Sequence, residues 1–545
     1  MSVILWVIFV GEINAIWGPP GAGKTTTLVD IFEKEIEETG KIFEDIAFST
    51  YRKPLAREFQ EKLKKRLNMG SLPDDVFIGT LHSLCLRLLK FEGYECGVAG
   101  PGDREEFCEE FNVEFSPDDS NGFSASTSRK KLGNLLFNLV SFCRTGFYDL
   151  SDYELGPIPF WKRGNIREGL VRSFHEEWED YKSENGLIDY DDMLLEVYEQ
   201  EYVPPVTVLL EDEFHDKTPV EYEIFKNWAA EIPKVYIAGD MLQAIYSFWN
   251  TDPEFFEEQY DNADSREVLP KSYRFGPDLW DYACRIVENV GLKTPDIETV
   301  PKDTEVDFLN MRGFRNTVDK VSDSSAFYLV RANYMMTPIV KTLRSKGIPF
   351  SVGHEKIGRV INVYNGVAKT REKLLSMGLR RASVSVELPS RGAEGLLKSY
   401  PERHFDGNKT EYYREAESKD RIEVAVNPSF RNVVSSNPFY SKFLLKSRPF
   451  GEDARKQAVL MWDRRGKKPV DLDKRHVVST IHGSKGREAD HVFLFDDITR
   501  SIAKDSDIEN EARVFFVGTT RARKHLWIVH GPSKHYTYDL PEAEK

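Results

Sequence analysis

The stretch GPPGAGKTT, from Gly18 to Thr26, decides the fold of this 545-residue chain. Its spacing is G-x-x-x-x-G-K-[ST], in which the glycines let backbone N–H groups turn inward around phosphate oxygens. The apolar residues 13–17 before it predict a strand. After it, apolar residues recur at helical spacing until Gly40, which is placed to end the helix. A strand, a phosphate loop and a helix in this order predict an α/β nucleotide-binding domain.

Other short apolar runs extend this pattern along the chain. They predict buried strands of parallel sheets in an early set at 42–48, 206–210 and 235–238, and in a late set at 326–330, 477–481, 491–495 and 526–529. Residues 86–185 are expected to be mostly helical. Residues 356–473 have a mixed pattern with loop signals, so we interpret both stretches as insertions into two sheet domains.

Composition excludes several classes of protein. Hydrophobic residues make up 40% of the chain, too many for a mostly disordered one, and the net charge of −15 argues against a wholly basic nucleic-acid binder. The five cysteines show no C-x-x-C spacing, so no zinc site or disulfide scaffold is predicted. The longest apolar run, 3–10, is far below the roughly 18 residues of a membrane span. We therefore expect a cytoplasmic protein.

A second motif, LLEDEFHD at 209–216, follows a predicted buried strand. Its acids are expected at the carboxyl end of that strand, where ligands of α/β proteins bind. Asp212, together with Thr25 of the phosphate loop, is placed to hold Mg²⁺, and Glu213 to act as general base on the attacking water. Lys24 is expected to reach the β and γ phosphates. Together the two motifs predict an ATP-hydrolysing site.

The order of the motifs resembles the UvrD/Rep/PcrA family of superfamily-one DNA helicases. Segments similar to that family run from the phosphate loop to about residue 530: AFSTYRKPLARE (47–58), GTLHSLCLRLL (79–89), LIDYDDMLL (187–195), DEFHD (212–216), GDMLQAIYSF (239–248), LPKSYRFGP (269–277), FYLVRANYMMTPIVKTLRSKGIPF (327–350), STIHGSKGREADHVFLF (479–495) and EARVFFVGTTRARKHLWIV (511–529).

The resemblance implies an α/β architecture of two RecA-like P-loop motor domains with parallel sheets, each carrying an inserted subdomain. The expected boundaries are 1–85 and 186–265 for the first motor domain, with a helical insertion at 86–185. The second motor domain is expected at 266–355 and 474–545, with an insertion at 356–473.

The family's ATP site is carried over residue by residue. The phosphate-binding residues are Gly18, Pro19, Pro20, Gly21, Ala22, Gly23, Lys24, Thr25 and Thr26. The resemblance implies that Gln243 contacts the γ phosphate, that Tyr273 stacks on the base and that Glu488 contacts the ribose. It also implies that Arg274 and Arg521 approach the γ phosphate from the second motor domain, where a guanidinium stabilises the developing charge. The cofactors expected are ATP and Mg²⁺.

The DNA contacts expected from the resemblance lie in three segments. They involve Thr80, His82, Tyr246, Phe248, Trp249, Thr480 and His482, of which the aromatic residues are expected to stack on bases. The partners expected are single-stranded DNA and tailed duplex DNA, with RNA left open. We expect a monomer or a weak oligomer.

The chain departs from the family at informative positions. His215 stands where the family usually has Gln, and its acidic neighbours favour a protonated imidazole. Trp249 stands where Arg is frequent, and residues 1–17 hold no Gln of the kind that reads adenine in the family. Three interpretations remain open: a DNA helicase with 3′-to-5′ movement, a single-strand translocase that displaces proteins, and a non-motor binding protein with a degenerate ATP site.

Overall fold

The computed structural model describes residues 11–117, 131–150, 168–353, 359–376, 384–426, 452–464, 476–531 and 536–542, without 41, 74, 75, 302, 401 and 506, together with 166, 430 and 439. The apolar run at 3–10 therefore lies outside the described residues. The chain divides into two compact units, 1–303 with 504–520, and 304–503 with 521–545. The motor-domain boundaries expected from the sequence stay predictions, because compactness alone does not identify a RecA-like domain.

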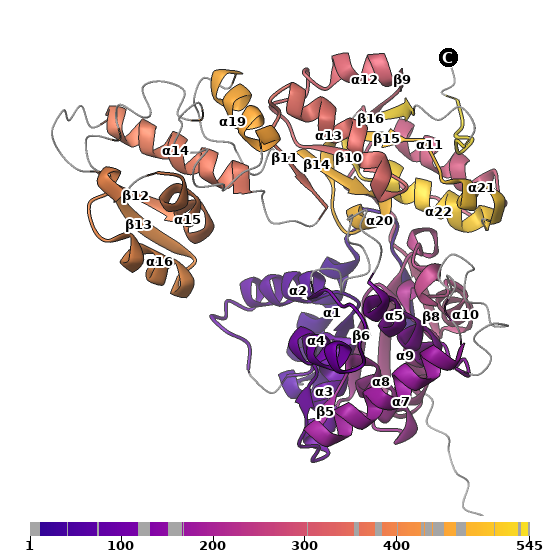
Figure 1. Cartoon of the computed structure of the whole chain (residues 1–545). Coiled ribbons are helices and arrows are strands. Elements are labelled where there is room, and N and C mark those ends of the chain that lie inside the picture. The colour runs from indigo at the N-terminus through magenta and orange to yellow at the C-terminus, as the bar shows by residue number, and fades with distance from the viewer. Residues whose placement is uncertain are drawn as a thin grey trace, which may run out of the picture. The chain divides into compact units, whose positions relative to one another are not determined.

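The first unit, most of which is coloured indigo to magenta in Figure 1, is built on an all-parallel sheet. This sheet has six strands in the order β3-β2-β6-β7-β1-β8. Its strands are β1 (Glu12–Trp17), β2 (Ile46–Thr50), β3 (Ile78–Thr80), β6 (Val208–Glu211), β7 (Lys234–Gly239) and β8 (Ser265–Val268). Because all strands run the same way, the loops after β1, β2, β6 and β7 emerge at one edge of the sheet.

Helices cover both faces of this sheet. One apolar core packs α1 (Lys24–Thr39) and α2 (Lys53–Arg66) against one face, and a second core packs α3 (Leu81–Phe91), α8 (Tyr190–Glu199) and α9 (Pro219–Glu231) against the other. Helix α1 ends at Gly40, whose φ of 71° is the left-handed value typical of a C-cap glycine. The strand expected at 42–48 begins later, because residues 43–45 form the turn η1 (Phe43–Asp45).

The helical insertion of the first unit has its own core. Aromatic rings of α4 (Pro101–Glu110), α5 (Leu132–Thr145) and α7 (Glu168–Asn185) pack together there, with Phe107 and Trp178 at a centroid distance of 5.0 Å. The remaining elements of this unit are β4 (Gly97–Val98), β5 (Leu187–Ile188), η3 (Phe214–Asp216), η4 (Met241–Gln243), η5 (Ser247–Trp249), α10 (Glu254–Asn262), α11 (Pro277–Glu288) and α22 (Ile508–Thr519).

The second unit contains another six-stranded parallel sheet, with the strand order β11-β14-β10-β15-β16-β9. Its elements are β9 (Glu305–Asn310), α12 (Met311–Thr317), β10 (Ala326–Val330), η6 (Asn333–Met335), α13 (Met336–Ser345), β11 (Phe350–Val352), β14 (His476–Thr480), α20 (Ile481–Ser484), β15 (Ala489–Phe495) and β16 (Ala522–His530). Helix α21 (Arg500–Asp505) lies where the chain passes between the units. The expected α/β class with two parallel sheets is confirmed.

A separate apolar core lies in the insertion of the second unit. It packs α14 (Arg359–Ser376), β12 (Val384–Pro389), α15 (Ser390–Ser399), η7 (Glu402–His404), α16 (Lys409–Ser418), β13 (Arg421–Val426) and α19 (Glu452–Arg464). Strands β12 and β13 pair antiparallel. This core is independent of the sheet core, which explains why the sequence at 356–473 looks unlike the sheet segments around it.

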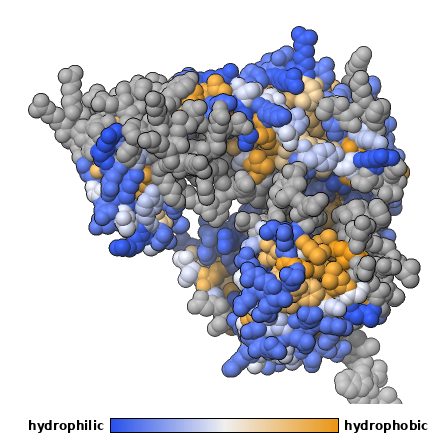
Figure 2. All heavy atoms as spheres, in the orientation of Figure 1, coloured by the Kyte–Doolittle hydropathy of each residue, from blue (hydrophilic) through white to orange (hydrophobic). Residues whose placement is uncertain are grey.

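The surface is largely hydrophilic and the cysteines are unpaired, as the composition of the chain indicates. Hydrophilic side chains cover much of the coloured surface in Figure 2, and an apolar area lies on the first unit. All five cysteines are free thiols. Among the described helices, none combines the length and the apolar character needed to cross a membrane.

Candidate functional site: a phosphate loop and a neighbouring pocket

The phosphate loop joins β1 to α1 in the conformation its glycines permit. Gly21 and Gly23 have φ values of 76° and 90°, which residues with a Cβ rarely adopt. A Cβ on Gly21 would also lie 2.6 Å from the Cβ of Arg274. The ammonium of Lys24 donates to the carbonyl of Gly18 over 2.8 Å. The loop is thus closed on itself, with its lysine across the opening.

The acidic turn after β6 meets the loop directly. The hydroxyl of Thr25 donates to Oδ2 of Asp212 over 2.7 Å, and the amide of Asp212 is anchored on the carbonyl of Ser49. Burial and the charge of Glu213 raise the pKa of Asp212 to about 6. A divalent cation fits this pair of oxygens, because carboxylate and hydroxyl oxygens are the donors that Mg²⁺ prefers and its charge offsets the crowding of the carboxylates.

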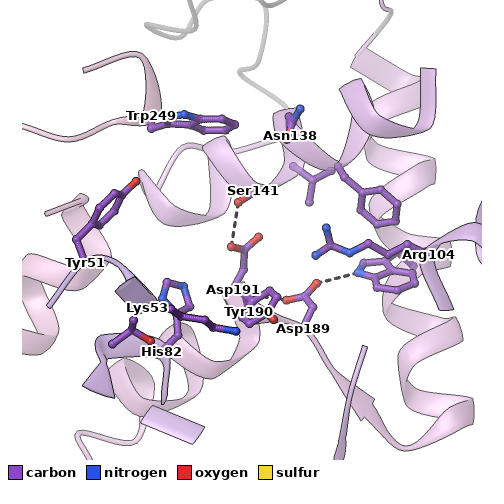
Figure 3. Close-up of a pocket in the computed structure, with 14 residues that line it drawn as sticks. Tyr51, Lys53, His82, Arg104, Asn138, Ser141, Asp189, Tyr190, Asp191 and Trp249 are labelled. Carbon is purple, nitrogen blue, oxygen red and sulfur yellow. Dashed lines mark hydrogen bonds between the residues drawn. The ribbon is translucent and has the colours of Figure 1, made fainter. Parts of the chain in front are cut away.

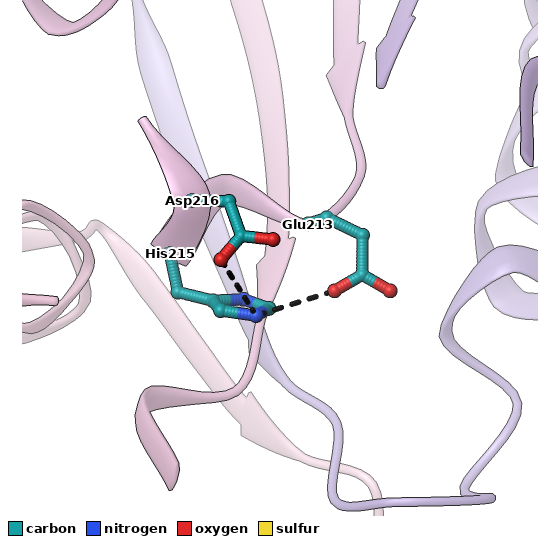
Figure 4. A group of neighbouring side chains, drawn as sticks. All are labelled: Glu213, His215 and Asp216. Atoms are coloured by element: carbon teal, nitrogen blue, oxygen red, sulfur yellow. Dashed lines mark ion pairs between the residues drawn. The ribbon is translucent and has the colours of Figure 1, made fainter. Parts of the chain in front are cut away.

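Glu213 is held in an unusual backbone conformation. Its φ of 57° lies in the left-handed region, which costs a non-glycine residue free energy and concentrates at functional sites. Its carboxylate faces His215, whose Nε2 lies 3.3 Å from Oε2 of Glu213 and 3.8 Å from Oδ1 of Asp216 (Figure 4). The strained turn therefore directs the candidate base toward the imidazole.

His215 is fully buried and bonded on its other side. The amide of Asp240 donates to its Nδ1 over 3.0 Å. A nitrogen that accepts an N–H bond carries no proton, so this ring is the neutral tautomer with its proton on Nε2. This geometry opposes the protonated imidazole expected from the sequence. It also explains how His replaces Gln, since both side chains offer one acceptor and one donor.

Asp240 joins this turn to the third motif. Its carboxylate accepts from the indole of Trp17 over 3.1 Å and from the side-chain amide of Gln243 over 2.7 Å. Asp240 itself is buried at the carboxyl end of β7, next to β1 in the sheet. The sequence placed Gln243 in the site but gave no role to Asp240, which fixes both neighbours.

Within the first unit, residues 269–276 lie against the phosphate loop. The amide of Tyr273 donates to the carbonyl of Gly21 over 3.0 Å, and the hydroxyl of Ser272 donates to that of Pro20 over 2.7 Å. The ring of Tyr273 is 65% exposed, so a face is open for stacking. The guanidinium of Arg274 donates to the carbonyl of Thr520 over 3.1 Å.

Four other candidates lie in the second unit. Arg521 begins the turn into β16 and its guanidinium lies 3.5 Å from the carbonyl of Arg487, while Glu488 lies 3.4 Å from Arg523. The hydroxyl of Thr480 caps α20 by accepting from the amide of Gly483, and His482 lies in that helix. These residues are close together in their own unit, and their roles stay predictions.

A pocket of about 360 Å³ lies between the sheet of the first unit and its helical insertion. Three expected DNA contacts, Thr80, His82 and Trp249, line it (Figure 3). Burial lowers the pKa of His82, which favours the neutral ring. Lys53, a basic candidate for nucleic-acid contact in the sequence, also lines the pocket. The remaining lining residues were not placed in a site from the sequence: Tyr51, Arg104, Phe137, Asn138, Val140, Ser141, Trp178, Asp189, Tyr190 and Asp191.

The third motif requires one correction. Tyr246 was expected to stack on a base, but its ring is only 1% exposed and packs on Tyr51 at a centroid distance of 5.7 Å. The guanidinium of Arg52 lies over the same ring. Tyr246 is therefore a packed residue behind Tyr51, and its buried ring is not open to a base. Phe248 lies half-buried next to Trp249.

The pocket residues that the sequence did not identify left only a weak signal in it. Asp189 and Asp192 form a capping box at the start of α8, within the segment 187–195 that resembles the family. That pattern predicts a helix start and does not reveal that α5 lies across from it. Arg104 and Ser141 lie in a stretch with no family motif, so only the fold brings them to the pocket.

Comparison with known proteins agrees with this architecture. The UvrD/REP helicase N-terminal domain family matches residues 7–264, and the UvrD-like helicase C-terminal domain family matches 476–529. The ATP-dependent DNA helicase PcrA of Bacillus subtilis is 21% identical over 605 residues, covering 94% of this chain and 79% of that protein. A "Probable DNA helicase" of Mycoplasma pneumoniae is 25% identical over 259 residues, covering 45% of this chain and 47% of that protein.

PcrA of Staphylococcus aureus (strain Mu50) is 21% identical over 293 residues, covering 50% of this chain and 38% of that protein. The match thus spans less than half the length of the Mycoplasma and Staphylococcus relatives. Each unit contains a parallel sheet, and the sheet of the first unit carries a phosphate loop and an acidic turn at one edge. These features define a P-loop protein. The two matched domains further show that this chain belongs to the UvrD/Rep/PcrA-like family of ATP-dependent helicases.

The hydrogen bonds of His215 predict the effect of replacing it. His215→Gln keeps an acceptor for the Asp240 amide and a donor toward Glu213, so we expect kcat within about threefold of the wild type and an unchanged pH–rate profile between about pH 6 and 8. His215→Phe leaves the buried amide unpaired, at a cost of about 1–3 kcal/mol, and should lower both Tm and kcat. A profile that His215→Gln flattens would show that the imidazole titrates during turnover.

Proposed function

We propose that this chain hydrolyses ATP and uses the energy to move along single-stranded DNA and to separate duplex DNA. The observation that carries the proposal is the contact between Thr25 of the phosphate loop and Asp212 of the acidic turn, at the carboxyl edge of a parallel sheet. Membership of a family whose relatives are named ATP-dependent DNA helicases supports it.

The residues at this edge have separate roles in the proposal. Lys24 leaves the Gly18 carbonyl to neutralise the β and γ phosphates, and the amides of the loop and of the α1 N-terminus hold the remaining oxygens. Glu213 orients the attacking water and takes its proton, with the Nε2–H of His215 keeping its carboxylate in place. Gln243, fixed by Asp240, contacts the γ phosphate or the water.

Thr25 and Asp212 are the residues proposed to hold Mg²⁺, which supplies positive charge that stabilises the phosphoryl oxygens. Arg274 and Arg521 are proposed to add guanidinium charge in the transition state. We assign Tyr273 to stacking on the base and Glu488 to the ribose. Each of these assignments is carried over from the family at matching positions.

The pocket between the sheet and the helical insertion is the proposed path of the strand. Helix α3 begins there without a side-chain cap, so its first amides are available for phosphate oxygens. Lys53 adds positive charge, and Trp249 offers a ring for base stacking, which is worth about 1–3 kcal/mol per base. Phosphate and base contacts thus come from adjacent walls.

Two substitutions test the ATPase proposal. Lys24→Ala should abolish turnover, and Glu213→Gln should lower kcat by about 10²–10⁴-fold while ATP binding remains, because only the base is removed. ATPase rates with and without single-stranded DNA measure both effects. The exposed Glu231→Gln on α9 is the matched control and should behave as wild type. Wild-type turnover in Lys24→Ala would refute the site.

Unwinding of tailed duplexes tests the motor proposal. We expect strand separation when the loading tail has a free 3′ end and little when it has a free 5′ end, because the family resemblance implies 3′-to-5′ movement. Displacement of streptavidin from a biotinylated single strand, measured in parallel, distinguishes a translocase. Displacement without unwinding would favour the single-strand translocase, and DNA-independent ATPase with neither activity would contradict both.

The exposed ring of Tyr273 predicts weak selection among nucleotides. Every base has a face for stacking, and residues 1–17 hold no glutamine of the kind that reads adenine in the family. We expect kcat/KM for GTP and CTP within about tenfold of ATP, a difference of about 1.4 kcal/mol. Tyr273→Ala should raise KM for ATP, GTP and CTP alike, and it should leave the ratios of their kcat/KM values unchanged. A hundredfold preference for ATP would mean that adenine is read elsewhere in the chain.

A further inference from the structure

Two carboxylates on the wall of the pocket differ sharply in their surroundings, although they are two residues apart. Asp189 caps α8 and accepts from the indole of Trp178 over 2.8 Å and from the amides of Asp191 and Asp192. Lys182 and Arg144 lie at 3.3 and 3.5 Å. Although burial opposes the effect, these two cations hold the pKa of Asp189 well below its usual range. Asp189 is therefore a structural residue that bonds the start of α8 to the helices of the insertion.

Asp191 has far fewer partners. Its Oδ1 accepts from the hydroxyl of Ser141 on α5 over 2.9 Å, and this is the only hydrogen bond to its carboxylate from the part of the chain that the structure describes. Burial and the charge of Asp189 raise its pKa to about 6, so it is a carboxylate at about pH 8. Figure 3 shows this carboxylate in the middle of the pocket, between Trp249 and the ring of His82.

A carboxylate is out of place in a groove that follows phosphates, because the two charges repel each other. It is suited to the edge of a base, since Asp and Glu accept from the exocyclic amine of cytosine, and adenine carries a similar amine. Thymine presents a carbonyl oxygen at the same position and would repel the carboxylate. The volume of about 360 Å³ lies within the range of small-ligand sites, about 300–1,000 Å³.

We propose that this pocket receives one base of the bound strand, that the base stacks on Trp249, and that Oδ2 of Asp191 accepts a hydrogen bond from its exocyclic amine. The pocket then favours cytosine and adenine over thymine. Asp191 is a specificity-determining residue, and Ser141 is the positioning residue that orients it. This inference rests on the proposed function, because it assumes that a DNA strand enters the pocket.

The test compares strands that differ only in the group facing Asp191. Fluorescence anisotropy at about pH 8 would measure Kd for three labelled homopolymers of equal length: deoxycytidine, thymidine, and the 2-pyrimidinone deoxynucleoside, which is cytosine without its amine. We expect deoxycytidine to bind about fivefold more tightly than the other two, the net effect of one hydrogen bond gained in exchange for bonds to water. This comparison uses the wild-type protein and needs no variant.

Two variants then test whether Asp191 causes the difference in Kd between the strands. Asp191→Asn can donate to thymine as well as accept from cytosine, so the ratio of the two Kd values should fall to about one. Glu199→Gln, at an exposed position of the same helix α8, removes the same charge and should keep the fivefold ratio. Thermal unfolding of both variants checks that they fold.

The outcomes separate the two levels of the proposal. Equal Kd values for deoxycytidine and 2-pyrimidinone strands in the wild type would overturn the inference about Asp191 and leave the proposed function standing. A fivefold ratio that survives Asp191→Asn would overturn it as well, since the selectivity would come from another residue. Failure to bind any of the three strands would overturn the proposed function itself.

Discussion

The parallel pairing of β1, β7 and β6 is the constraint on which the candidate ATP site depends. Trp17 pairs with Gly239 and Glu211 pairs with Ile237, so these three strands end at nearly the same level of the sheet. The phosphate loop, the third motif and the acidic turn follow these ends directly. Segments about 200 residues apart in the sequence therefore deliver Thr25, Gln243 and Asp212 to one edge without long connecting loops.

This edge is polar and buried, which makes hydrogen bonding decisive. A buried carboxylate or amide without a partner costs about 1–3 kcal/mol, and Asp240 avoids this cost by accepting from Trp17, Leu242 and Gln243. Its own amide is satisfied by His215, which connects the third motif to the turn of Glu213. The site is thus one network, and a substitution that removes one of its donors or acceptors changes the orientation of the others.

Sequence alone predicted this edge well, because each motif carries a local physical signature. Gly40 ends α1 where the helical spacing stops, and the late strand at 326–330 has the bounds expected for it. The acids of 212–213 follow a buried strand, as their context indicated. These features depend on backbone conformation and on periodicity, both of which are written in neighbouring residues.

Features that depend on distant packing were not predictable in the same way. Tyr246 has the composition of a stacking residue, and only the position of Tyr51 on β2's outgoing loop shows that its ring is covered. The contact of Ser141 with Asp191 joins residues 50 positions apart across an insertion without a recognisable motif. Such contacts follow from tertiary packing, which spacing and composition do not encode.

The short segment from Gln243 to Trp249 connects the candidate ATP site to the pocket beside the helical insertion. It begins at η4, which the carboxylate of Asp240 caps, and it ends at η5, where the amide of Trp249 donates to the carbonyl of Tyr246. Asn250, directly after it, donates to the carbonyl of Phe142 on α5. Because both ends are bonded and Tyr246 is packed in between, the segment has little freedom to absorb a displacement. Under the proposed function, a shift of Gln243 on hydrolysis would move Trp249 and the α5 wall of the pocket together, which is the mechanical link that the proposed movement along a strand requires.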